Sequence, residues 1–539
     1  MSGSFSEKIV TSGEKAPQSK RGVWRWIAIS LLLLIIAVAT TVEIMFHRAE
    51  PILKSRVIET LSTRFDSRVE MDRFQVSVMK GFEVSGDGLR IYSPDDVVEA
   101  GAKDPLISLG HFAFHVSVAG LFAKPMHVGR VSVRGMTISI PPREIRRQQA
   151  KGEHSIGKIE IVVDEIDCED SKLIIGTAKP DKDPKEFDLQ HIVMHNVGPN
   201  DPWRYDATLV NAIPTGNIHA IGTFGPWVNE SPGDSTVAGK YTFEDADLST
   251  IKGIAGILSS VGEFNGQLNR ITVDGTTETP SFALDTANHP VPLRTKFHAI
   301  VDGTSGDTYL QPVQAKLQQS EFSCIGAIIN VKGKGHIIDL DVTVPNGRIQ
   351  DFLELAIKAK PVLMTGRLNM KTKLHIRPGD ESVTLKLGLN GNFKLKAIHF
   401  SNPEWQDKVD MLSLRARGDA KEAKPGAEDV SSQMSGDFVM GSGKLHFNKL
   451  AYTLPGADIN LAGVYSLDGN QLDFDGKVRT KAALSQMVAT WWKSWLLKPV
   501  DPFFKKNGAG AEIPIKISGS KESPKFGLDL KHKDKEKGE

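Results

Sequence analysis

Apolar and polar residues alternate along most of this chain, and no other feature of the sequence limits its fold as strongly. In an extended strand successive side chains point to opposite faces, so each alternating stretch presents one apolar face. Gly, Pro, Asn and Asp cluster about every ten residues, which is the spacing of successive strands and turns. The sequence therefore predicts half-buried antiparallel strands. The apolar positions of the clearest stretches are Phe112, Phe114, Val116, Val118, Ile159, Ile161, Val163, Ile338, Leu340, Val342, Val344, Val383, Leu385, Leu387 and Leu389.

Helical patterns are few and short. Apolar residues at helical spacing predict helices over residues 51–65, 248–258, 349–357 and 484–497, with Asp247 as the N-cap of the second. The last three each follow a strand and a glycine, which indicates a weak repeat of strand, helix, glycine and strand. Units of this kind stack into an elongated body rather than one compact core.

The predicted helix over residues 484–497 carries the strongest apolar stripe. We expect this amphipathic helix to pack on the sheet. The alternative is a tryptophan-rich surface helix that touches a membrane or the mouth of an apolar channel. The stripe consists of Leu484, Met487, Val488, Trp491 and Trp495.

A second constraint is the uninterrupted apolar run over residues 26–46. A helix of that length reaches about 31 Å, which is enough to cross the hydrocarbon core of a bilayer. Lys and Arg are in excess before the run, which predicts a cytoplasmic segment over residues 1–25, a single transmembrane anchor over 26–46 and export of the remainder. A cleaved signal peptide is the alternative, with Ala37-Val38-Ala39 as the cleavage site, but apolar residues continue beyond Ala39 and favour an anchor.

Charge and cysteine usage exclude several classes of protein. The net charge of +1 supplies no electrostatic footprint for nucleic acid. Cys168 and Cys324 stand far apart, without a CxxC or metal-ligand spacing, so we expect neither a disulfide framework nor a zinc site.

Two H-x-x-x-H pairs would bring imidazoles together only on a helix. His111 and His115 lie in an alternating stretch, where four strand residues span about 13 Å, too far for two ligands of one metal. We interpret this pair, and also His191 with His195, as polar-face histidines. The chain also lacks a catalytic motif, so we expect neither an enzyme nor a cofactor-dependent protein.

With these features the chain resembles the AsmA-like family of envelope proteins, which is related in architecture to bridge-like lipid transfer proteins. The likeness runs nearly from end to end and includes the basic N-terminus and single anchor. It continues with a helix entering strands over residues 51–78, glycine-rich strands such as 301–308, and a closing strand and turn over 513–519 and 523–526. The family offers no catalytic residue, so none is carried over.

The resemblance implies a mainly β fold: a single N-terminal transmembrane helix followed by an elongated, twisted antiparallel β-sheet trough with a few short amphipathic helices. We divide the exported body into a β-rich part over residues 47–240, an AsmA-like C-terminal β-rich repeat region over 241–530 and a charged tail over 531–539. About 35 strands at about 4.8 Å would give a trough on the order of 170 Å.

The resemblance also implies a function. The expected protein is anchored in the inner membrane, lies mainly in the periplasm, and shelters phospholipids on an apolar inner face while they move toward the outer membrane. Its expected partners are phospholipid, the membrane and other envelope proteins. The alternative is a structural or assembly factor for outer-membrane proteins or glycolipids that moves no lipid, and an exported hydrolase or glycan-binding module ranks last. The candidate groove residues are Phe112, Phe114, Val116, Val118, Ile338, Leu340, Val342, Leu385, Leu387 and Leu389.

Overall fold

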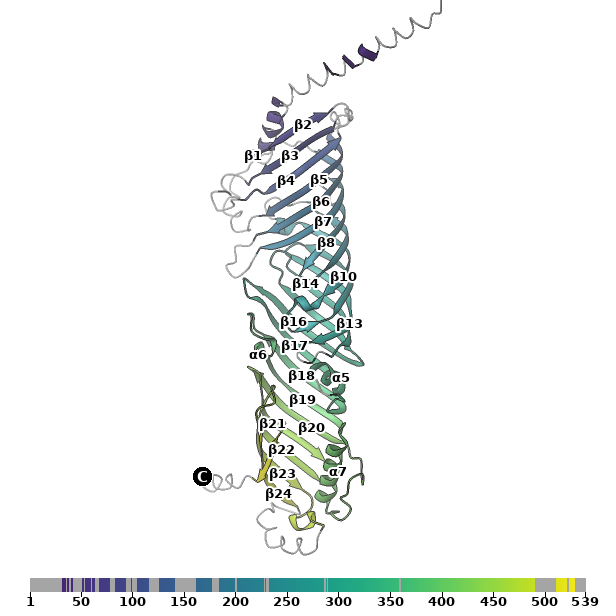
Figure 1. The fold of residues 1–539 in the computed structure, drawn as a ribbon, viewed down its shortest axis with the longest axis vertical. Coiled ribbons are helices and arrows are strands. Elements are labelled where there is room, and N and C mark those ends of the chain that lie inside the picture. Colours follow the sequence, from purple (N-terminus) through teal and green to yellow (C-terminus); the bar gives the residue numbers. More distant parts are fainter. Residues whose placement is uncertain are drawn as a thin grey trace, which may run out of the picture.

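The molecule is an elongated body built on a single β-sheet, seen in a computed structural model (Figure 1). The N-terminal strands lie at one end of the body and the C-terminal strands at the other (Figure 1). The structure describes residues 32–34, 36–37, 40–41, 51–52, 54–59, 61–63, 67–77, 83–93, 98, 104–115, 126–140, 161–176, 184–198, 201–226, 228, 232–285, 287, 289–357, 360–489, 510–520 and 523–528.

The sheet has 25 strands in the described part of the chain, fewer than the roughly 35 expected, and at about 4.8 Å each they span on the order of 110 Å. The first strands are β1 (Val69–Glu70), β2 (Arg73–Ser77), β3 (Glu83–Ile91), β4 (Ile107–His115), β5 (Met126–Ile140), β6 (Ile161–Ile175), β7 (Lys185–Val197), β8 (Trp203–Ala212), β9 (Thr215–Phe224), β10 (Thr236–Asp247), β11 (Ile254–Ala255) and β12 (Ile257–Gln267). The others are β13 (Arg270–Leu284), β14 (Val291–Val301), β15 (Thr308–Leu317), β16 (Ser320–Val331), β17 (Gly335–Arg348), β18 (Met364–Ile376), β19 (Leu387–Phe400), β20 (Ser432–Gly441), β21 (Lys444–Leu454), β22 (Ala457–Ser466), β23 (Leu472–Thr480), β24 (Ala511–Gly519) and β25 (Pro524–Leu528).

Nearly all strands pair with their neighbours in the chain. From β12 to β25 each pair of consecutive strands is antiparallel. Among the described strands, the parallel pair β5–β6 is the exception to the antiparallel pattern. The sheet also continues across residue 240, because β10 pairs with β9 on one side and β12 on the other. The expectation of a mainly antiparallel β fold is confirmed.

Two α-helices, of 8 and 15 residues, lie between described strands. The predicted helix at 349–357 is confirmed as α5 (Ile349–Ala356), whereas α7 (Pro403–Arg417) was not predicted. The ends of α7 carry ordinary signals, because the Asn402 side chain accepts hydrogen bonds from the amides of Glu404 and Trp405, and Gly418 ends the helix at φ 101°.

The predicted helix over 248–258 is wrong. Asp247 does cap a helical turn, but that turn is the 3₁₀ element η2 (Leu248–Thr250), and the chain then enters β11 and β12. Gly253 and Gly256 adopt φ values of 98° and 124°, which a right-handed helix does not allow. The proposed strand–helix repeat fails with it, because the recurring unit is a simple hairpin.

The predicted strand at 383–386 needs correction, and part of the predicted helix at 484–497 stays open. Residues 383–386 alternate like a strand but form the short helix α6 (Val383–Lys386), so β19 begins only at Leu387. The predicted helix at 484–497 begins as the 3₁₀ turn η3 (Leu484–Met487), and Val488 is already extended at φ −109°. Trp491 and Trp495 lie outside the described residues, so the stripe that includes them stays a prediction.

Successive hairpin turns lie at alternate long edges of an antiparallel sheet. From β8 onward we call the first edge the one that carries η2, α5 and α7, and the second edge the one that carries α6. Small clusters of fully buried side chains lie near β3–β6, beneath α5 and beside α7. Val57, Ile58 and Leu61 of the predicted 51–65 helix pack on the first cluster. The rest of the sheet has no comparable cover among the described residues.

Glycines face aromatic rings across neighbouring strands. At Gly222 and Gly391 an added Cβ would lie 1.9 and 2.3 Å from backbone oxygens of the adjacent strand, so only glycine permits this close approach. Such positions let a sheet curve, and the facing ring covers the glycine. The pairs are Gly86 with Phe112, Gly222 with Tyr205, Gly239 with Phe264, Gly262 with Tyr241, Gly275 with Phe297, Gly391 with Phe438, Gly436 with Phe393 and Gly463 with Phe474.

Of the apolar run over 26–46, the structure describes only residues 32–34, 36–37 and 40–41, all of them helical. The large side chains among them are exposed, as for Leu33 and Leu34, each at 60%. Among the described residues, no helix has both the length and the apolar character needed to span a bilayer. The expected anchor therefore remains a prediction.

Candidate binding surface: one apolar face along the sheet

One row of directly opposed residues crosses the sheet from β3 to β23, and every member is apolar, glycine or tyrosine. Residues directly opposite in register point to the same face, so this row lies on one side of the sheet. The row consists of Val84, Phe114, Val131, Ile166, Met194, Tyr205, Gly222, Gly239, Phe264, Val273, Ala299, Leu310, Gly326, Leu340, Leu374, Leu389, Met440, Leu445, Tyr465 and Leu472.

A second row, on the opposite face, has the reverse character. It runs from β3 to β21 and contains a single apolar residue, Val261. The two faces are therefore segregated along nearly the whole sheet. The second row consists of Asp87, His111, Arg134, Glu169, His191, Thr208, His219, Thr242, Val261, Thr276, Lys296, Gln314, Ser323, Thr343, Lys371, Asn392, Asp437 and Lys449.

Most of the apolar row is only half-buried. Ala299 and Met440 are its fully buried members, at 2% and 6% exposure. The others, such as Leu340, Leu374 and Leu389, keep part of their surface in solvent. A packed protein core would bury such side chains almost completely, so the described part of the chain supplies no covering layer over much of this face.

The predicted groove residues can now be placed. Phe114, Leu340 and Leu389 belong to the apolar row, and Phe112, Ile338, Val342 and Leu387 lie on the same face at two-residue steps from them. Leu385 was wrongly assigned to a strand; it belongs to α6 and is 47% exposed. Val116 and Val118 lie outside the described residues.

Local alternation did not reveal an aromatic ladder on the apolar face. Phe393 lies 6.1 Å from Phe438 and 6.3 Å from Phe447, and Phe447 lies 6.0 Å from Phe474, measured between ring centroids. These rings come from four different strands, β19, β20, β21 and β23. Only the register of the strands brings them together.

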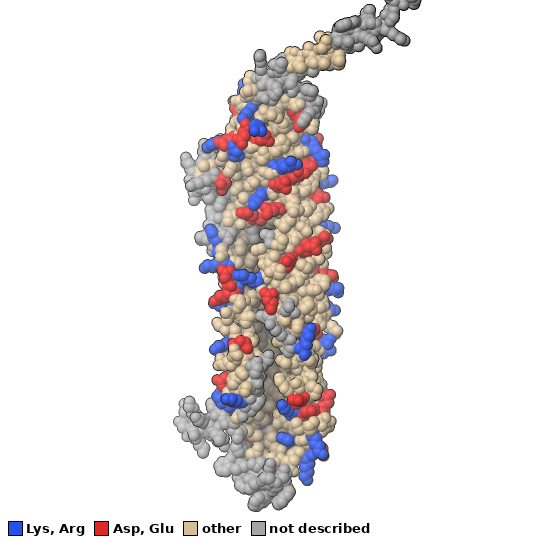
Figure 2. Space-filling model, viewed as in Figure 1, with Lys and Arg blue, Asp and Glu red and all other residues tan. Residues whose placement is uncertain are grey.

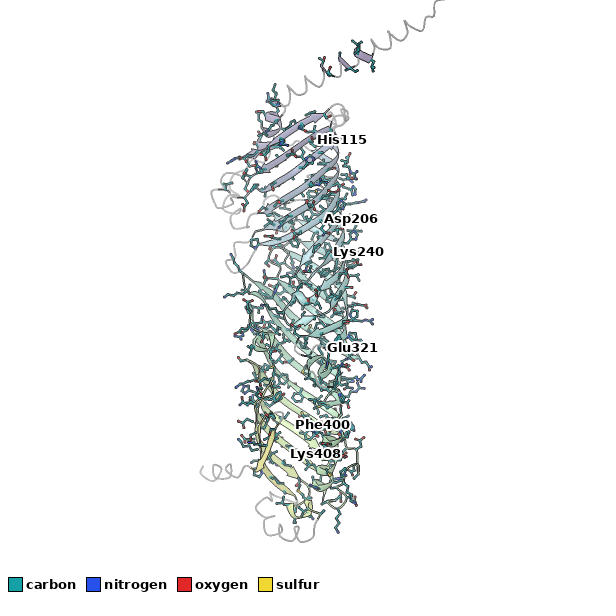
Figure 3. All side chains as sticks on the ribbon, viewed as in Figure 1. His115, Asp206, Lys240, Glu321, Phe400 and Lys408 are labelled. Carbon is teal, nitrogen blue, oxygen red and sulfur yellow. The ribbon has the colours of Figure 1, made fainter. Side chains whose placement is uncertain are left out.

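The polar face is held by ion pairs between strands. The Arg134 guanidinium lies 2.8 Å from the Glu169 carboxylate, and Lys516 lies 3.0 Å from Asp475. Acidic and basic side chains are intermingled along the body (Figure 2). Four residues of this face, His115, Asp206, Lys240 and Glu321, follow one another down its length (Figure 3).

The predicted polar-face histidines pair with carboxylates. His111 Nδ1 lies 2.8 Å from Asp87 Oδ1, and His191 Nε2 lies 2.8 Å from Asp167 Oδ1. Both H-x-x-x-H pairs lie in strands, β4 and β7, as expected from their alternation. In the described part of the chain, no three His, Cys, Asp or Glu side chains converge on a possible metal position.

Two titratable groups on the apolar face, Cys168 and Tyr205, have raised pKa values. Burial raises the pKa of the Cys168 thiol to about 12, and burial raises the pKa of the Tyr205 hydroxyl to about 12. Both groups are therefore uncharged at neutral pH and suit an apolar neighbour.

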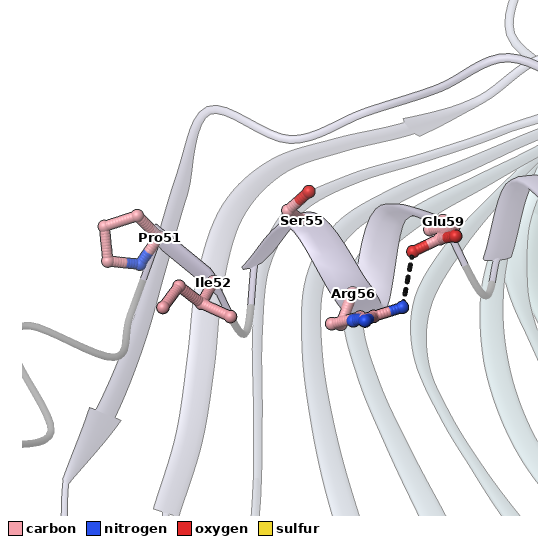
Figure 4. A pocket seen from close by; sticks show the side chains of 5 residues that line it. All are labelled: Pro51, Ile52, Ser55, Arg56 and Glu59. Carbon is pink, nitrogen blue, oxygen red and sulfur yellow. Dashed lines mark hydrogen bonds and ion pairs between the residues drawn. The ribbon is translucent and has the colours of Figure 1, made fainter.

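A separate hollow of about 460 Å³ beside the start of the 51–63 segment is lined by Arg56 and Glu59, an exposed ion pair at 3.2 Å (Figure 4).

This arrangement presents a long uncharged surface on one side of the sheet and a solvated charged surface on the other. No protein-family model, curated protein or solved structure matches the chain.

Proposed function

We propose that this chain is an AsmA-like envelope protein that shelters the acyl chains of phospholipids on its apolar face and lets them move along it without catalysis. The apolar row from β3 to β23 carries the proposal. An apolar face that the described residues leave uncovered is stabilised by contact with another apolar group, and acyl chains are apolar, flexible and long. A hollow that runs lengthwise in the lower half of Figure 2 supports the idea of a trough.

The sequence before the sheet supports a location for this activity. The apolar run over 26–46 and the basic residues before it favour an anchor in the inner membrane, with the bulk of the chain in the periplasm. An anchor of this kind would hold one end of the apolar face close to a lipid source. The outer membrane is the proposed destination.

A photo-crosslinking experiment tests lipid binding directly. A benzophenone amino acid at Leu374, which belongs to the apolar row, should trap a phospholipid in living cells. The same group at Lys373, one residue away on the opposite face and exposed, should trap none. Mass spectrometry of the adducts identifies what is bound.

The outcomes at these two positions separate the candidate functions. A protein adduct at Leu374 in place of lipid would favour the assembly-factor alternative. Equal trapping of lipid at both positions would mean that the apolar face has no special role, and the proposed function would then fail.

The proposed topology predicts the pattern of protease accessibility. In spheroplasts, residues after Phe46 should be digested from outside, and a tag placed before Trp26 should be protected. A mature N-terminus at Thr40, or digestion confined to the cytoplasmic side, would contradict this prediction.

A further inference from the structure

The two long edges of the sheet come into contact beside η2 and α6. On the first edge, Lys252 and Gly253 follow η2; on the second edge, Asp380 and Val383 lie between β18 and β19. Lys252 Nζ is 3.1 Å from Asp380 Oδ1, although the two residues are 128 positions apart. Gly253 packs against Val383 so closely that an added Cβ would lie 2.3 Å from its Cγ2. We call this contact the seam.

The seam closes a ring. Between its two sides lie the short strand β11 and the seven strands β12 to β18, so this part of the sheet makes a complete turn around its apolar face. A barrel of about eight strands leaves an interior just wide enough for side chains or one small ligand. Ala299, Val313 and Ala315 of the apolar face are buried here, at 2%, 7% and 6% exposure. The larger members of the row in these strands, such as Leu340 and Leu374, stay half-buried.

We infer that the seam is a gate for lengthwise lipid movement, an inference that rests on the proposed function. Acyl chains fit against an apolar face, but a phospholipid headgroup carries charge and must remain in water. A headgroup therefore projects through the opening between the two edges as the lipid moves. A closed seam obstructs the headgroup, so the edges must part each time a lipid passes β12–β18.

The contacts at the seam are weak enough to open. Its ion pair is exposed, with side chains 68% and 102% accessible, and exposed pairs of this kind contribute little stability. A second contact joins one glycine to one valine. Opening it therefore disrupts neither the paired strands nor a buried core.

Reversible cross-linking of the seam tests the gate. In the full-length protein with Cys168 and Cys324 replaced by alanine, Lys252→Cys and Asp380→Cys are joined by a thiol-cleavable bismaleimide. Transfer of a fluorescent phospholipid between vesicles of phosphatidylethanolamine and phosphatidylglycerol should fall at least about ten-fold, because the headgroup path is closed. The lipid retained per protein should stay unchanged, and cleavage of the linker should restore transfer.

A same-edge cross-link provides the control. Lys334→Cys with Asp380→Cys joins two neighbours on the second edge, where the Gly379 amide donates to the Lys334 carbonyl, and this link should leave transfer at the rate of the same variant before cross-linking. Undiminished transfer across a fully cross-linked seam would overturn the gate while leaving lipid binding intact. A protein that carries no lipid before cross-linking would overturn the proposed function, and the gate with it.

A charge reversal provides a second measurement. Asp380→Lys places two like charges at the seam and should raise the transfer rate about two- to five-fold, the effect expected of an exposed ion pair. The swapped pair Lys252→Asp with Asp380→Lys should return the rate to that of the unaltered protein. If neither variant changed the transfer rate, that result would count against the gate.

Discussion

Replacing Leu389 by glutamate should leave the protein folded and strip it of lipid. Leu389 lies in the apolar row between Leu374 and Met440 and is half-buried. A carboxylate against acyl chains would have to give up water or take up a proton, at a cost of several kcal/mol. Each 1.4 kcal/mol is a factor of ten in binding, so phospholipid retained per protein should fall at least about ten-fold. Mass spectrometry of extracted lipid measures the loss, and thermal unfolding measures the fold.

The neighbouring residue supplies the matched control. Asn390→Glu places the same charge one residue along β19, on the opposite exposed face, and should change neither lipid content nor unfolding temperature. By contrast, Phe112→Glu falls in a packed cluster with Val133 and Leu89, so it should lose several kcal/mol of stability. If Leu389→Glu unfolded the protein as Phe112→Glu does, Leu389 would belong to a dry core and not to a lipid surface.

Replacing Gly476 by alanine should cost about 3 kcal/mol of unfolding free energy, a large effect for one methyl group. The added Cβ would lie 2.0 Å from the backbone oxygen of Asn460 on the adjacent strand. Backbone cannot rotate away as a side chain does, so β22 and β23 must separate locally. Thermal unfolding measures the loss, and hydrogen exchange of the β22 and β23 amides shows whether it is local.

Gly441 is the matched control for this substitution. An added Cβ there meets nothing within 4 Å, and Gly441→Ala should be neutral or stabilise by up to about 1 kcal/mol. Equal stability of the two alanine variants would show that the sheet relaxes around Gly476, and that close strand approach is not what the glycine provides.

Strand faces could be predicted from the sequence because they depend only on a period of two. Leu340 and Val342 were assigned to the correct face on that basis. The same pattern misleads at residues 383–386, where the Leu385 and Lys386 amides instead donate to the Ser382 carbonyl and close the turn of α6. Alternation cannot distinguish a strand from a short turn that happens to contain alternating residues.

Helix prediction failed where backbone conformation outweighed the apolar pattern. The 248–258 stretch has helical spacing, but Gly253 and Gly256 hold positive φ values and direct the chain into strands. The α7 helix was missed because its interior pattern is weak, although Asn402 and Gly418 mark both ends. Cap residues were the better signal in that case.

The sequence predicted the strands that form the candidate site but not the contacts between those strands. Whether Gly391 faces Phe438 depends on the register between β19 and β20, and an α-helix and a loop separate those strands. The seam is further removed from local sequence, because Lys252 and Asp380 meet only after seven strands have completed a turn. Tertiary curvature decides both contacts.

The pairing of each strand with its chain neighbours makes the length of this molecule an adjustable quantity. Adding one hairpin would extend the apolar face by about 10 Å and would leave the hairpins on either side with the partners they already have. A compact barrel or sandwich has no such freedom, since an extra strand changes how every layer closes. A gene that duplicates or loses a hairpin can therefore lengthen or shorten the protein by small steps, and each intermediate in that series remains a folded sheet.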